Sequence, residues 1–233
     1  TAASVRYALY DHEVRILEAC GRNLRLQRLD RSRLCLITDP GGSDCSAEML
    51  KRVELALATG VSLVQYRRKQ GTDALRLQEA RQLAELCQAH QALLIINDRI
   101  DLALLVNADG VHLGQDDLPH AAARQLMGPE KLIGRSTHRL AQLEQAQEEG
   151  ADYLGVGAVY ATATKADRTA AGLGWVRDAS ASARIPWFAI GGINGDNITE
   201  VLAAGASRVA VVSAIMGASD PAAAARQLLT QLG

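Results

Sequence analysis

The sequence is poor in aromatic residues and carries almost no net charge. Only 3% of its 233 residues are Phe, Trp or Tyr, and 25 basic residues are balanced by 26 acidic ones. Proteins that bind nucleic acid usually show a clustered basic excess, and those that bind single strands stack the bases on aromatic side chains. The composition therefore argues against a nucleic-acid partner.

Long apolar runs are absent as well. The longest have the length of a strand, well short of the roughly 20 residues that a membrane-spanning helix needs. The first residues contain acids and no continuous apolar region, so they do not resemble a signal peptide. The four cysteines, Cys20, Cys35, Cys45 and Cys87, show no CxxC spacing. We expect reduced thiols in a cytoplasmic protein with no membrane partner.

From residue 33 onward, short apolar segments alternate with amphipathic helical patterns. The segments expected to form buried strands are 33–39, 62–67, 92–97, 110–113, 132–136, 152–157, 187–192 and 208–213. The clearest helical patterns lie between them, at 47–60, 73–90, 140–151 and 197–206. Three of these patterns contain a glycine near their end that suits a left-handed helix cap: Gly60, Gly150 and Gly205.

Eight such strand–helix units fit an α/β fold of the (β/α)8 TIM-barrel type over residues 33–233. An open doubly wound sheet would alternate in the same way, but the sequence has neither GxGxxG at a helix start nor GxxxxGK[ST]. Residues 1–32 do not fit a strand–helix unit. We expect them to form a helical extension whose apolar stripe, including Leu17 and Leu24, packs on the lower end of the barrel or against a partner chain.

In a barrel, functional side chains gather where the strands end. The second predicted strand ends in Gln65-Tyr66-Arg67-Arg68-Lys69, and strand alternation places Gln65, Arg67 and Lys69 on one side. An amide and two cations at that place suit a ligand with phosphate groups. The alternative is a solvated basic patch at the start of a loop.

The next two strands end in carboxylates. Asp98 follows Asn97 after the third strand, and Asp116 and Asp117 follow the fourth. Asp98 could cap the following helix. Two carboxylates beside a phosphate-seeking strand nevertheless favour Mg²⁺, which binds through one or two carboxylates and substrate phosphates. A lone His112 fits a packed or turn-bonded histidine better than a zinc ligand.

The last four strands end in small and polar residues. Ser136 follows the fifth strand, where it could also be a helix N-cap. Thr162, Thr164 and Lys165 follow the sixth, and the polar run 166–171 after them could be a lid or a surface loop without function. The glycine pair 191–192 and the end of the eighth strand suit a phosphate site.

Taken together, several of these motifs resemble the thiamine-phosphate synthase family. They are Gln65-x-Arg67-x-Lys69, Asn97-Asp98-Arg99, GVHLGQDDLP (110–119), GRSTH (134–138), DYLGVGAVYATATK (152–165) and AIGGIN (189–194). They follow the family's order from about residue 33 to the C-terminus. GVHLGQxDLP and the TxTK strand end are specific, whereas the glycine pair is common to many barrels.

The resemblance implies a transferase reaction that joins the two halves of thiamine. In this family, 4-amino-2-methyl-5-pyrimidinylmethyl diphosphate loses pyrophosphate, and the nitrogen of a thiazole phosphate attacks the resulting methylene cation. Such chemistry needs positioning and electrostatic stabilisation of the leaving diphosphate rather than a strong base. The resemblance also implies Mg²⁺ as cofactor, the two phosphorylated substrates as partners, and a homodimer.

The resemblance also implies roles for the strand-end residues. The diphosphate would be held by Arg67, Lys69, Asn97, Ser136 and Lys165. Mg²⁺ would be bound by Asp98 and Asp117, and the pyrimidine would be contacted by Gln65. The thiazole phosphate would be lined by Thr162, Thr164, Gly192, Val212 and Ser213. Asp116 stands where the family usually has Glu, so the metal is assigned to Asp117.

Three positions depart from the family pattern. Ala158 and Ala161 replace two prolines, which should make the following loop less rigid. Arg135 replaces a small apolar residue and is expected to add a cation near the mouth of the barrel.

Three other functions fit parts of the pattern. A paralogous thiazole tautomerase would not need the diphosphate and metal residues. A non-catalytic sensor of thiamine phosphates would have little reason to keep both carboxylates. A sugar-phosphate aldolase or epimerase would need a Schiff-base lysine or an acid/base pair of carboxylates at the strand ends.

Overall fold

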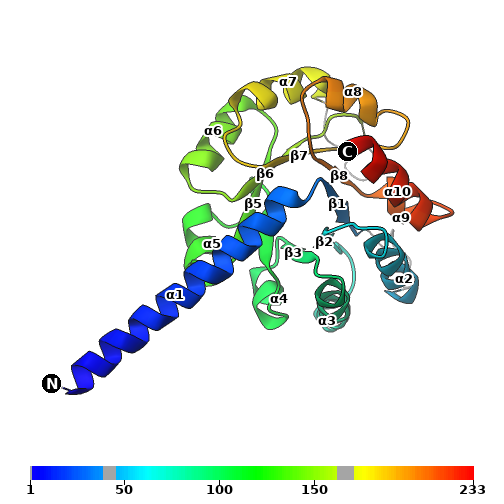
Figure 1. Cartoon of the computed structure of the whole chain (residues 1–233). Helices are drawn as coiled ribbons and strands as arrows, with labels where there is room; N and C mark the ends of the chain where they lie inside the picture. The colour runs from blue at the N-terminus through cyan, green and yellow to red at the C-terminus, as the bar shows by residue number, and fades with distance from the viewer. Residues whose placement is uncertain (1, 39–45, 162–170) are drawn as a thin grey trace.

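The computed structural model describes residues 2–38, 46–161 and 171–233. Parallel strands form a closed barrel in chain order from β1 to β8, and helices surround it (Figure 1). The strands are β1 (Leu34–Ile37), β2 (Leu63–Tyr66), β3 (Leu93–Asn97), β4 (Gly110–Leu113), β5 (Leu132–Thr137), β6 (Tyr153–Gly157), β7 (Trp187–Ile190) and β8 (Val209–Val211). The predicted (β/α)8 barrel is confirmed, and each predicted strand overlaps an observed one.

The helices follow the strands and cover the outside of the barrel. They are α1 (Ala2–Arg31), α2 (Ser46–Leu57), α3 (Asp73–Ala89), α4 (Ile100–Leu105), α5 (His120–Met127), α6 (Leu140–Glu148), α7 (Gly172–Ser182), α8 (Ile198–Ala203), α9 (Ser213–Met216) and α10 (Pro221–Leu232). Gly60, Gly150 and Gly205 have φ angles of 104°, 88° and 105°, so the chain turns into the next strand through the left-handed region, as predicted.

The strands bury both of their faces. Leu63 and Leu93 belong to an apolar cluster inside the barrel, whereas their neighbours Val64 and Leu94 belong to a second cluster beneath the helices. Successive strand residues point to opposite sides, so each strand supplies both clusters. This double burial explains why the strands are continuous apolar runs in the sequence.

Helix α1 closes one end of the barrel and then projects away from it (Figure 1). Leu29 is completely buried in the cluster inside the barrel, and Leu26 packs against the same cluster. Two arginines of α1 add ionic contacts, since Arg22 donates to Asp152 at 2.5 Å and Arg25 donates to Asp109 at 3.0 Å. The expected packing on the lower end of the barrel is therefore present at the C-terminal end of α1.

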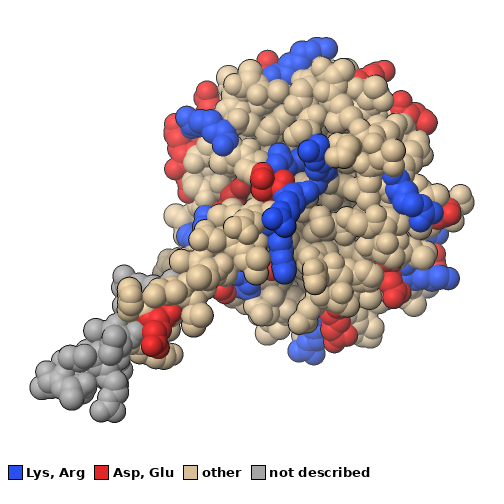
Figure 2. Space-filling model, viewed as in Figure 1, with Lys and Arg blue, Asp and Glu red and all other residues tan. Residues whose placement is uncertain are grey.

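The two leucines named above in the apolar stripe predicted for α1, Leu17 and Leu24, do not face the barrel. Leu17 and Leu24 are 70% and 51% exposed, because the barrel contacts the opposite side of the helix and only its last turns. The division into an extension of 1–32 and a barrel of 33–233 remains a prediction. Basic and acidic side chains are interspersed on the face that carries α1 (Figure 2). Within the described part of the chain, no helix is long and apolar enough to cross a membrane.

Candidate active site

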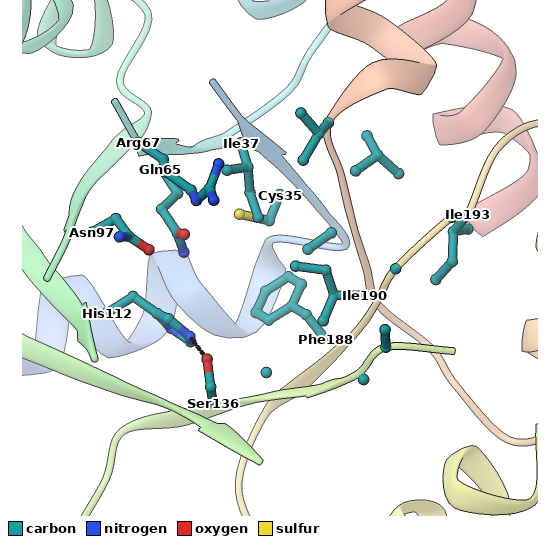
Figure 3. A pocket seen from close by; sticks show the side chains of 18 of the residues that line it. Cys35, Ile37, Gln65, Arg67, Asn97, His112, Ser136, Phe188, Ile190 and Ile193 are labelled. Carbon is teal, nitrogen blue, oxygen red and sulfur yellow. Dashed lines mark hydrogen bonds between the residues drawn. The ribbon is translucent and has the colours of Figure 1, made fainter. Parts of the chain in front are cut away.

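A cavity of about 310 Å³ lies at the C-terminal ends of the strands, on the side opposite α1. One wall is polar and is formed by Gln65, Arg67, Asn97, His112 and Ser136 (Figure 3). The other wall is mainly apolar and includes Cys35, Ile37, Phe188, Ile190 and Ile193 (Figure 3). The cavity therefore brings together these predicted site residues: Gln65, Arg67, Asn97, Ser136, Gly192, Val212 and Ser213.

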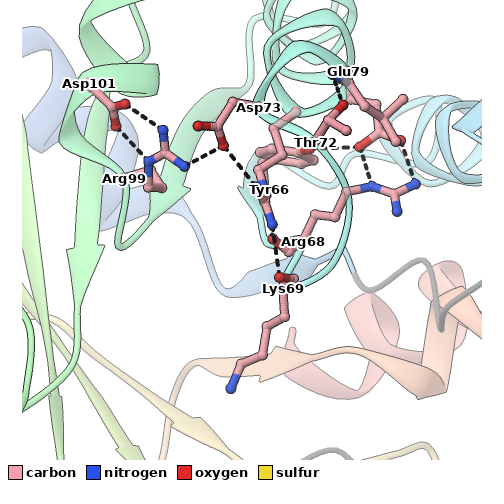
Figure 4. A network of polar contacts seen from close by, with 10 residues as sticks. Tyr66, Arg68, Lys69, Thr72, Asp73, Glu79, Arg99 and Asp101 are labelled. Atoms are coloured by element: carbon pink, nitrogen blue, oxygen red, sulfur yellow. Dashed lines mark hydrogen bonds and ion pairs between the residues drawn. The ribbon is translucent and has the colours of Figure 1, made fainter.

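Alternation along β2 divides its polar residues between the cavity and the outside of the barrel. Gln65 and Arg67 line the cavity and are only 5% and 8% exposed. Arg68 points outward and donates to both carboxylate oxygens of Glu79, at 2.8 and 3.0 Å (Figure 4). Lys69 is exposed beyond the strand and is not among the residues that line the cavity.

The backbone of Arg67 is fixed by a buried threonine of the neighbouring chain segment. The Arg67 N–H donates to Thr38 Oγ1 at 2.9 Å, and the same hydroxyl donates to the Arg67 carbonyl at 3.2 Å. Thr38 follows β1 and has no exposed surface. This pair of hydrogen bonds holds the end of β2 against β1. It therefore fixes the backbone position from which the Arg67 side chain extends into the cavity.

Asp98 and Asp117 form a second polar group, beside Arg67. Asp98 has a φ angle of 61°, a left-handed conformation that Asp adopts more readily than most residues. Asp98 is exposed. Desolvation nevertheless raises the pKa of its carboxyl to about 6, and a hydrogen bond with Asp117 and the charge of Asp117 add to that shift. Asn97 and Arg67 act in the opposite direction.

The two carboxylates are close enough to repel each other, which favours a bound cation. Asp117 also accepts a hydrogen bond from the Gly114 N–H at 2.6 Å, which orients its carboxylate. Neither Asp98 nor Asp117 lines the cavity itself. In the described part of the chain, no three His, Cys, Asp or Glu side chains are arranged to hold a metal. A cation held by this pair would need further oxygens from a ligand.

Ser136 is held by a histidine in the polar wall. Its Oγ lies 2.9 Å from His112 Nε2 (Figure 3). On the other side of the ring, His112 Nδ1 lies 3.1 Å from the hydroxyl of Tyr153. Two glycines provide the space for these rings. A Cβ on Gly134 would collide with the Tyr153 ring and lie 2.6 Å from His112 Nδ1, and a Cβ on Gly155 would lie 3.2 Å from the His112 ring.

Tyr153 is buried between two other rings. Its ring meets that of Phe188 edge-on at a centroid distance of 5.9 Å and that of His112 at 5.4 Å. Burial raises the pKa of Tyr153 well above its ordinary value, Cys35 and Asp152 act in the same direction, and a hydrogen bond from Gln65 acts against them. The phenol is therefore a neutral hydrogen-bonding group.

The loop after β7 brings Gly192 to the cavity. Gly192 has a φ angle of 67°, and a Cβ there would lie 2.8 Å from Cβ of Tyr160, so the turn requires glycine. Asn197 donates to the Gly192 carbonyl at 2.9 Å, and Asn194 accepts from the Asn197 N–H at 3.3 Å. This asparagine pair orders the loop before any ligand binds.

Part of the predicted site lies outside the described residues. This applies to Thr162, Thr164 and Lys165 and to the predicted lid as far as residue 170. The described residues on either side are held by backbone hydrogen bonds. Val159 N–H donates to Ile190 at 2.9 Å, and Ala171 N–H donates to Ala158 at 2.8 Å. Ala158 and Ala161, the two positions that replace prolines, both line the cavity.

Arg135 does not add a cation to the mouth of the barrel, so that expectation was wrong. Its neighbours Gly134 and Ser136 face inward, which turns Arg135 outward, where it is 7% exposed and donates to the Leu118 carbonyl at 3.3 Å. The arginine contacts the loop after β4 instead.

The sequence did not identify three polar residues of the cavity. His112 was expected to be packed or turn-bonded, which is correct, but it also lines the cavity together with Tyr153 and His138. His138 Nδ1 lies 2.5 Å from the Gly157 carbonyl. The alternation of side chains along a strand could have identified Tyr153. It stands two residues before Gly155 and four before Gly157, so all three point to the same side of β6, into the cavity.

The family model described as thiamine monophosphate synthase matches residues 34–215. The chain belongs to this family. A curated thiamine-phosphate synthase of Synechococcus sp. (strain WH7803) is 69% identical over 232 residues, which are 100% of this chain and 66% of the relative. One from Prochlorococcus marinus (strain MIT 9313) is 53% identical over the same share of each protein. The chain thus spans about two thirds of the length of these relatives.

One solved structure agrees with the family assignment. The thiamine phosphate pyrophosphorylase from Pyrococcus furiosus is 37% identical and superposes with a TM-score of 0.79, covering 90% of this chain and 97% of that one. A 3-hexulose-6-phosphate synthase superposes with a TM-score of 0.62 at 18% identity, which shows a shared barrel fold and nothing more.

Proposed function

We propose that this chain is the catalytic part of a thiamine-phosphate synthase. It joins 4-amino-2-methyl-5-pyrimidinylmethyl diphosphate to a thiazole phosphate and releases pyrophosphate. The observation that carries the proposal is a cavity with one polar and one apolar wall, with the Asp98–Asp117 pair next to Arg67 at its polar side. Membership of the family supplies the type of reaction.

The polar wall suits the diphosphate. Arg67, Asn97 and Ser136 present a guanidinium, an amide and a hydroxyl from three different strand ends, and all three can donate to phosphate oxygens. Lys69 and Lys165 would add further cations from loops. These donors would stabilise the charge that develops on the diphosphate as its bond to the pyrimidine methylene breaks.

The carboxylate pair suits Mg²⁺. Asp98 and Asp117 offer hard oxygen donors at adjacent strand ends, and the diphosphate would supply the further oxygens that the pair needs. When bound, Mg²⁺ would neutralise negative charge on the leaving group. Because neither carboxylate lines the cavity, the metal would lie beside it, and the pyrimidine ring of the substrate would occupy the cavity itself.

The remaining surfaces suit the two rings. Gln65 would hydrogen-bond the aminopyrimidine, and the apolar wall with Ile37, Phe188 and Ile190 would keep water from the methylene cation. The thiazole nitrogen donates its lone pair to that carbon and forms the new C–N bond, so no proton needs to be removed. The thiazole phosphate would be bound by Gly192, Val212 and Ser213, and by Thr162 and Thr164.

The carboxylate pair also favours a synthase over the alternatives. A thiazole tautomerase on the same fold would use the thiazole-phosphate side but would not need Asp98 and Asp117. A non-catalytic sensor would bind the same ligands without turnover. A cytoplasmic location and a homodimer are consistent with this function and remain predictions.

The test is a turnover assay with the purified chain. The two substrates are mixed with and without Mg²⁺, and thiamine phosphate is converted to fluorescent thiochrome and quantified. We expect product that depends on Mg²⁺. Binding of the thiazole phosphate with no product under any condition would refute the synthase and favour the tautomerase or the sensor.

A second measurement tests the metal assignment. Asp98→Ala should abolish Mg²⁺-dependent turnover and leave the affinity for the thiazole phosphate within about twofold, because that ligand lies on the other side of the cavity. Full activity of Asp98→Ala would show that the metal is held elsewhere. Glu148→Ala, an acidic residue at the end of α6, is the matched control.

A further inference from the structure

An arginine of α3 holds the backbone of the loop between β2 and α3. Arg76 Nη2 donates to the Lys69 carbonyl at 2.9 Å, and Arg76 Nε donates to the Arg68 carbonyl at 3.3 Å. Both carbonyls lie beyond Tyr66, where the pairing of β2 with β3 ends. They belong to the peptide groups on either side of the Lys69 Cα. One guanidinium therefore fixes the backbone from which the Lys69 side chain starts.

The third nitrogen of the same guanidinium joins this loop to the loop after β3. Arg76 Nη1 donates to Asp73 Oδ1 at 2.8 Å, and the same oxygen accepts from Arg99 Nη1 at 2.8 Å. Arg99 also donates to both carboxylate oxygens of Asp101, at 2.8 and 2.6 Å (Figure 4). We call Arg76, Asp73, Arg99 and Asp101 the arginine network. Its second arginine directly follows Asp98 in the chain.

The ammonium of Lys69 is not part of the arginine network. The Lys69 side chain is exposed and extends away from the ion pairs (Figure 4). Among the residues that the structure describes, Lys69 contacts the network through its carbonyl, and its ammonium makes no ion pair. The backbone of Lys69 is thus fixed while its charge stays available for an anion.

Both ends of the loop are anchored as well. At the start, Arg68 is bound to the buried carboxylate of Glu79. At the end, Thr72 Oγ1 accepts from the Leu75 N–H at 3.2 Å and caps α3. Gly71 between them has a φ angle of 107°, which few other residues adopt. The loop is therefore ordered before any ligand binds.

Stability alone gives little reason for the arginine network. The side chains of Asp73 and Asp101 are 66% and 57% exposed, and ion pairs to exposed carboxylates contribute little to folding. What the network does accomplish is local, because all three nitrogens of Arg76 are used on the β2–α3 loop and on the first residue of α3. Its effect is to fix the position of that loop.

We propose that Arg76 is a positioning residue for the diphosphate site, which holds the Lys69 backbone so that the ammonium meets the diphosphate without first ordering the loop. Asp73 and Arg99 orient the Arg76 guanidinium and tie it to the loop that carries Asp98. The inference rests on the proposed function, because it takes from it that Lys69 binds the diphosphate. It adds a residue that does not line the cavity.

Pyrophosphate, the released product, tests this role without relying on turnover. Its affinity for the chain at saturating Mg²⁺ is measured by calorimetry, together with that of the thiazole phosphate. Arg76→Met should weaken pyrophosphate binding about tenfold, because the loop must then be ordered on binding, and should leave the thiazole phosphate within about twofold. Arg81→Met, at an exposed position of the same helix, is the matched control and should bind both ligands as the wild type does.

A double-mutant cycle shows whether Arg76 acts through Lys69. Lys69→Met should itself weaken pyrophosphate binding, and adding Arg76→Met should cause little further loss, because the loop no longer carries the cation. Arg76→Lys keeps the positive charge but not the planar fork that reaches two carbonyls and a carboxylate. It should bind pyrophosphate nearly as weakly as Arg76→Met. Wild-type affinity in Arg76→Lys would show that the charge alone matters and would refute the positioning role.

The outcomes separate this inference from the proposed function. Wild-type affinity in Arg76→Met, or an equal loss with and without the Lys69 ammonium, would overturn the inference, and thiochrome-detected turnover in the wild type would then leave the synthase intact. The expected cycle without turnover would support the role of Arg76 and refute the synthase. A wild-type chain that binds no pyrophosphate overturns both. Should Arg76→Met fail to fold, Arg76→Lys in the two backgrounds decides in the same way.

Discussion

The buried ion pair between Arg68 and Glu79 should make Arg68→Met strongly destabilising. Their side chains are 3% and 0% exposed, and Glu79 accepts hydrogen bonds from Arg68 at 2.8 and 3.0 Å, from Tyr66 at 2.7 Å and from Ser46 at 2.5 Å. Methionine can fill the volume of the arginine stem but leaves a buried carboxylate without its cation.

The magnitude follows from what remains around Glu79. Breaking a buried pair by removing one partner costs about 3–5 kcal/mol, and the two hydroxyls that stay on the carboxylate place this case near 3 kcal/mol. For a domain of this size, such a loss lowers the melting temperature by roughly 6–12 °C. Arg68→Met/Glu79→Gln should be more stable than the single variant, because the double variant no longer buries an unpaired charge.

The effect should also depend on pH. Burial pushes the pKa of Glu79 upward, but hydrogen bonds from Arg68, Ser46 and Tyr66 outweigh it and hold the pKa below its ordinary value. A carboxyl whose pKa is lowered by folding stabilises the protein above its unfolded pKa, about 4.3 for Glu, and loses that contribution as the pH falls through the folded pKa. In Arg68→Met the buried carboxyl has lost its cation, so its folded pKa lies above the unfolded one. The difference between wild type and Arg68→Met should therefore be largest near pH 7 and decrease as the pH falls toward and below about 4.

Urea unfolding followed by circular dichroism at pH 7 and at acidic pH measures these differences. The slope of the unfolding free energy with urea should be the same for all variants, so that the midpoints report stability alone. The reasoning is refuted if Arg68→Met loses less than about 1 kcal/mol at pH 7, or if the double variant is no more stable than the single one.

Three further predictions follow from the packing and the site. Gly134→Ala should cost about 1–3 kcal/mol in urea unfolding and abolish thiochrome-detected turnover, because its Cβ would collide with the Tyr153 ring; a stable and active variant would contradict this. Leu29→Ala should cost about 2–5 kcal/mol, since Leu29 is fully buried in the barrel end, whereas exposed Leu17→Ala should cost less than about 0.5 kcal/mol. Asp117→Asn should reduce Mg²⁺-dependent turnover about 100-fold with little effect on stability, and unchanged turnover would remove it from the metal site.

The barrel could be predicted because double burial leaves a simple pattern. Strands covered on both faces are continuous apolar runs in the sequence. Several helices are followed by a glycine with a left-handed conformation, such as Gly60 and Gly205, which marks the turn into the next strand. The strand ends then collect polar residues at one end of the barrel. For this reason the sequence predicted that Gln65, Arg67 and Ser136 lie at the same end of the barrel, and in the structure all three line one cavity.

The side-chain contacts between neighbouring strands could not be predicted from the sequence. His112 meets Ser136 and Tyr153 only because Gly134 pairs with both His112 and Tyr153 across β4, β5 and β6. Spacing along one strand contains no information about that register. Likewise, the apolar stripe of α1 gave no indication that Leu29, on the other side of the helix, would close the barrel.

Strand β2 shows how one short segment serves stability and chemistry at the same time. Its residues alternate between the cavity and the outer layer, so Gln65 and Arg67 face the ligand while Tyr66 and Arg68 are bound to Glu79 of α3. A shift of the strand by one residue would exchange the two sets, so that Gln65 and Arg67 would turn away from the cavity and Tyr66 and Arg68 would lose their contacts with Glu79. The outward ion pair therefore fixes the register that aims Arg67 at the cavity. Loss of the ion pair should therefore disturb the position of Arg67 in the cavity, even though neither Arg68 nor Glu79 lines the cavity.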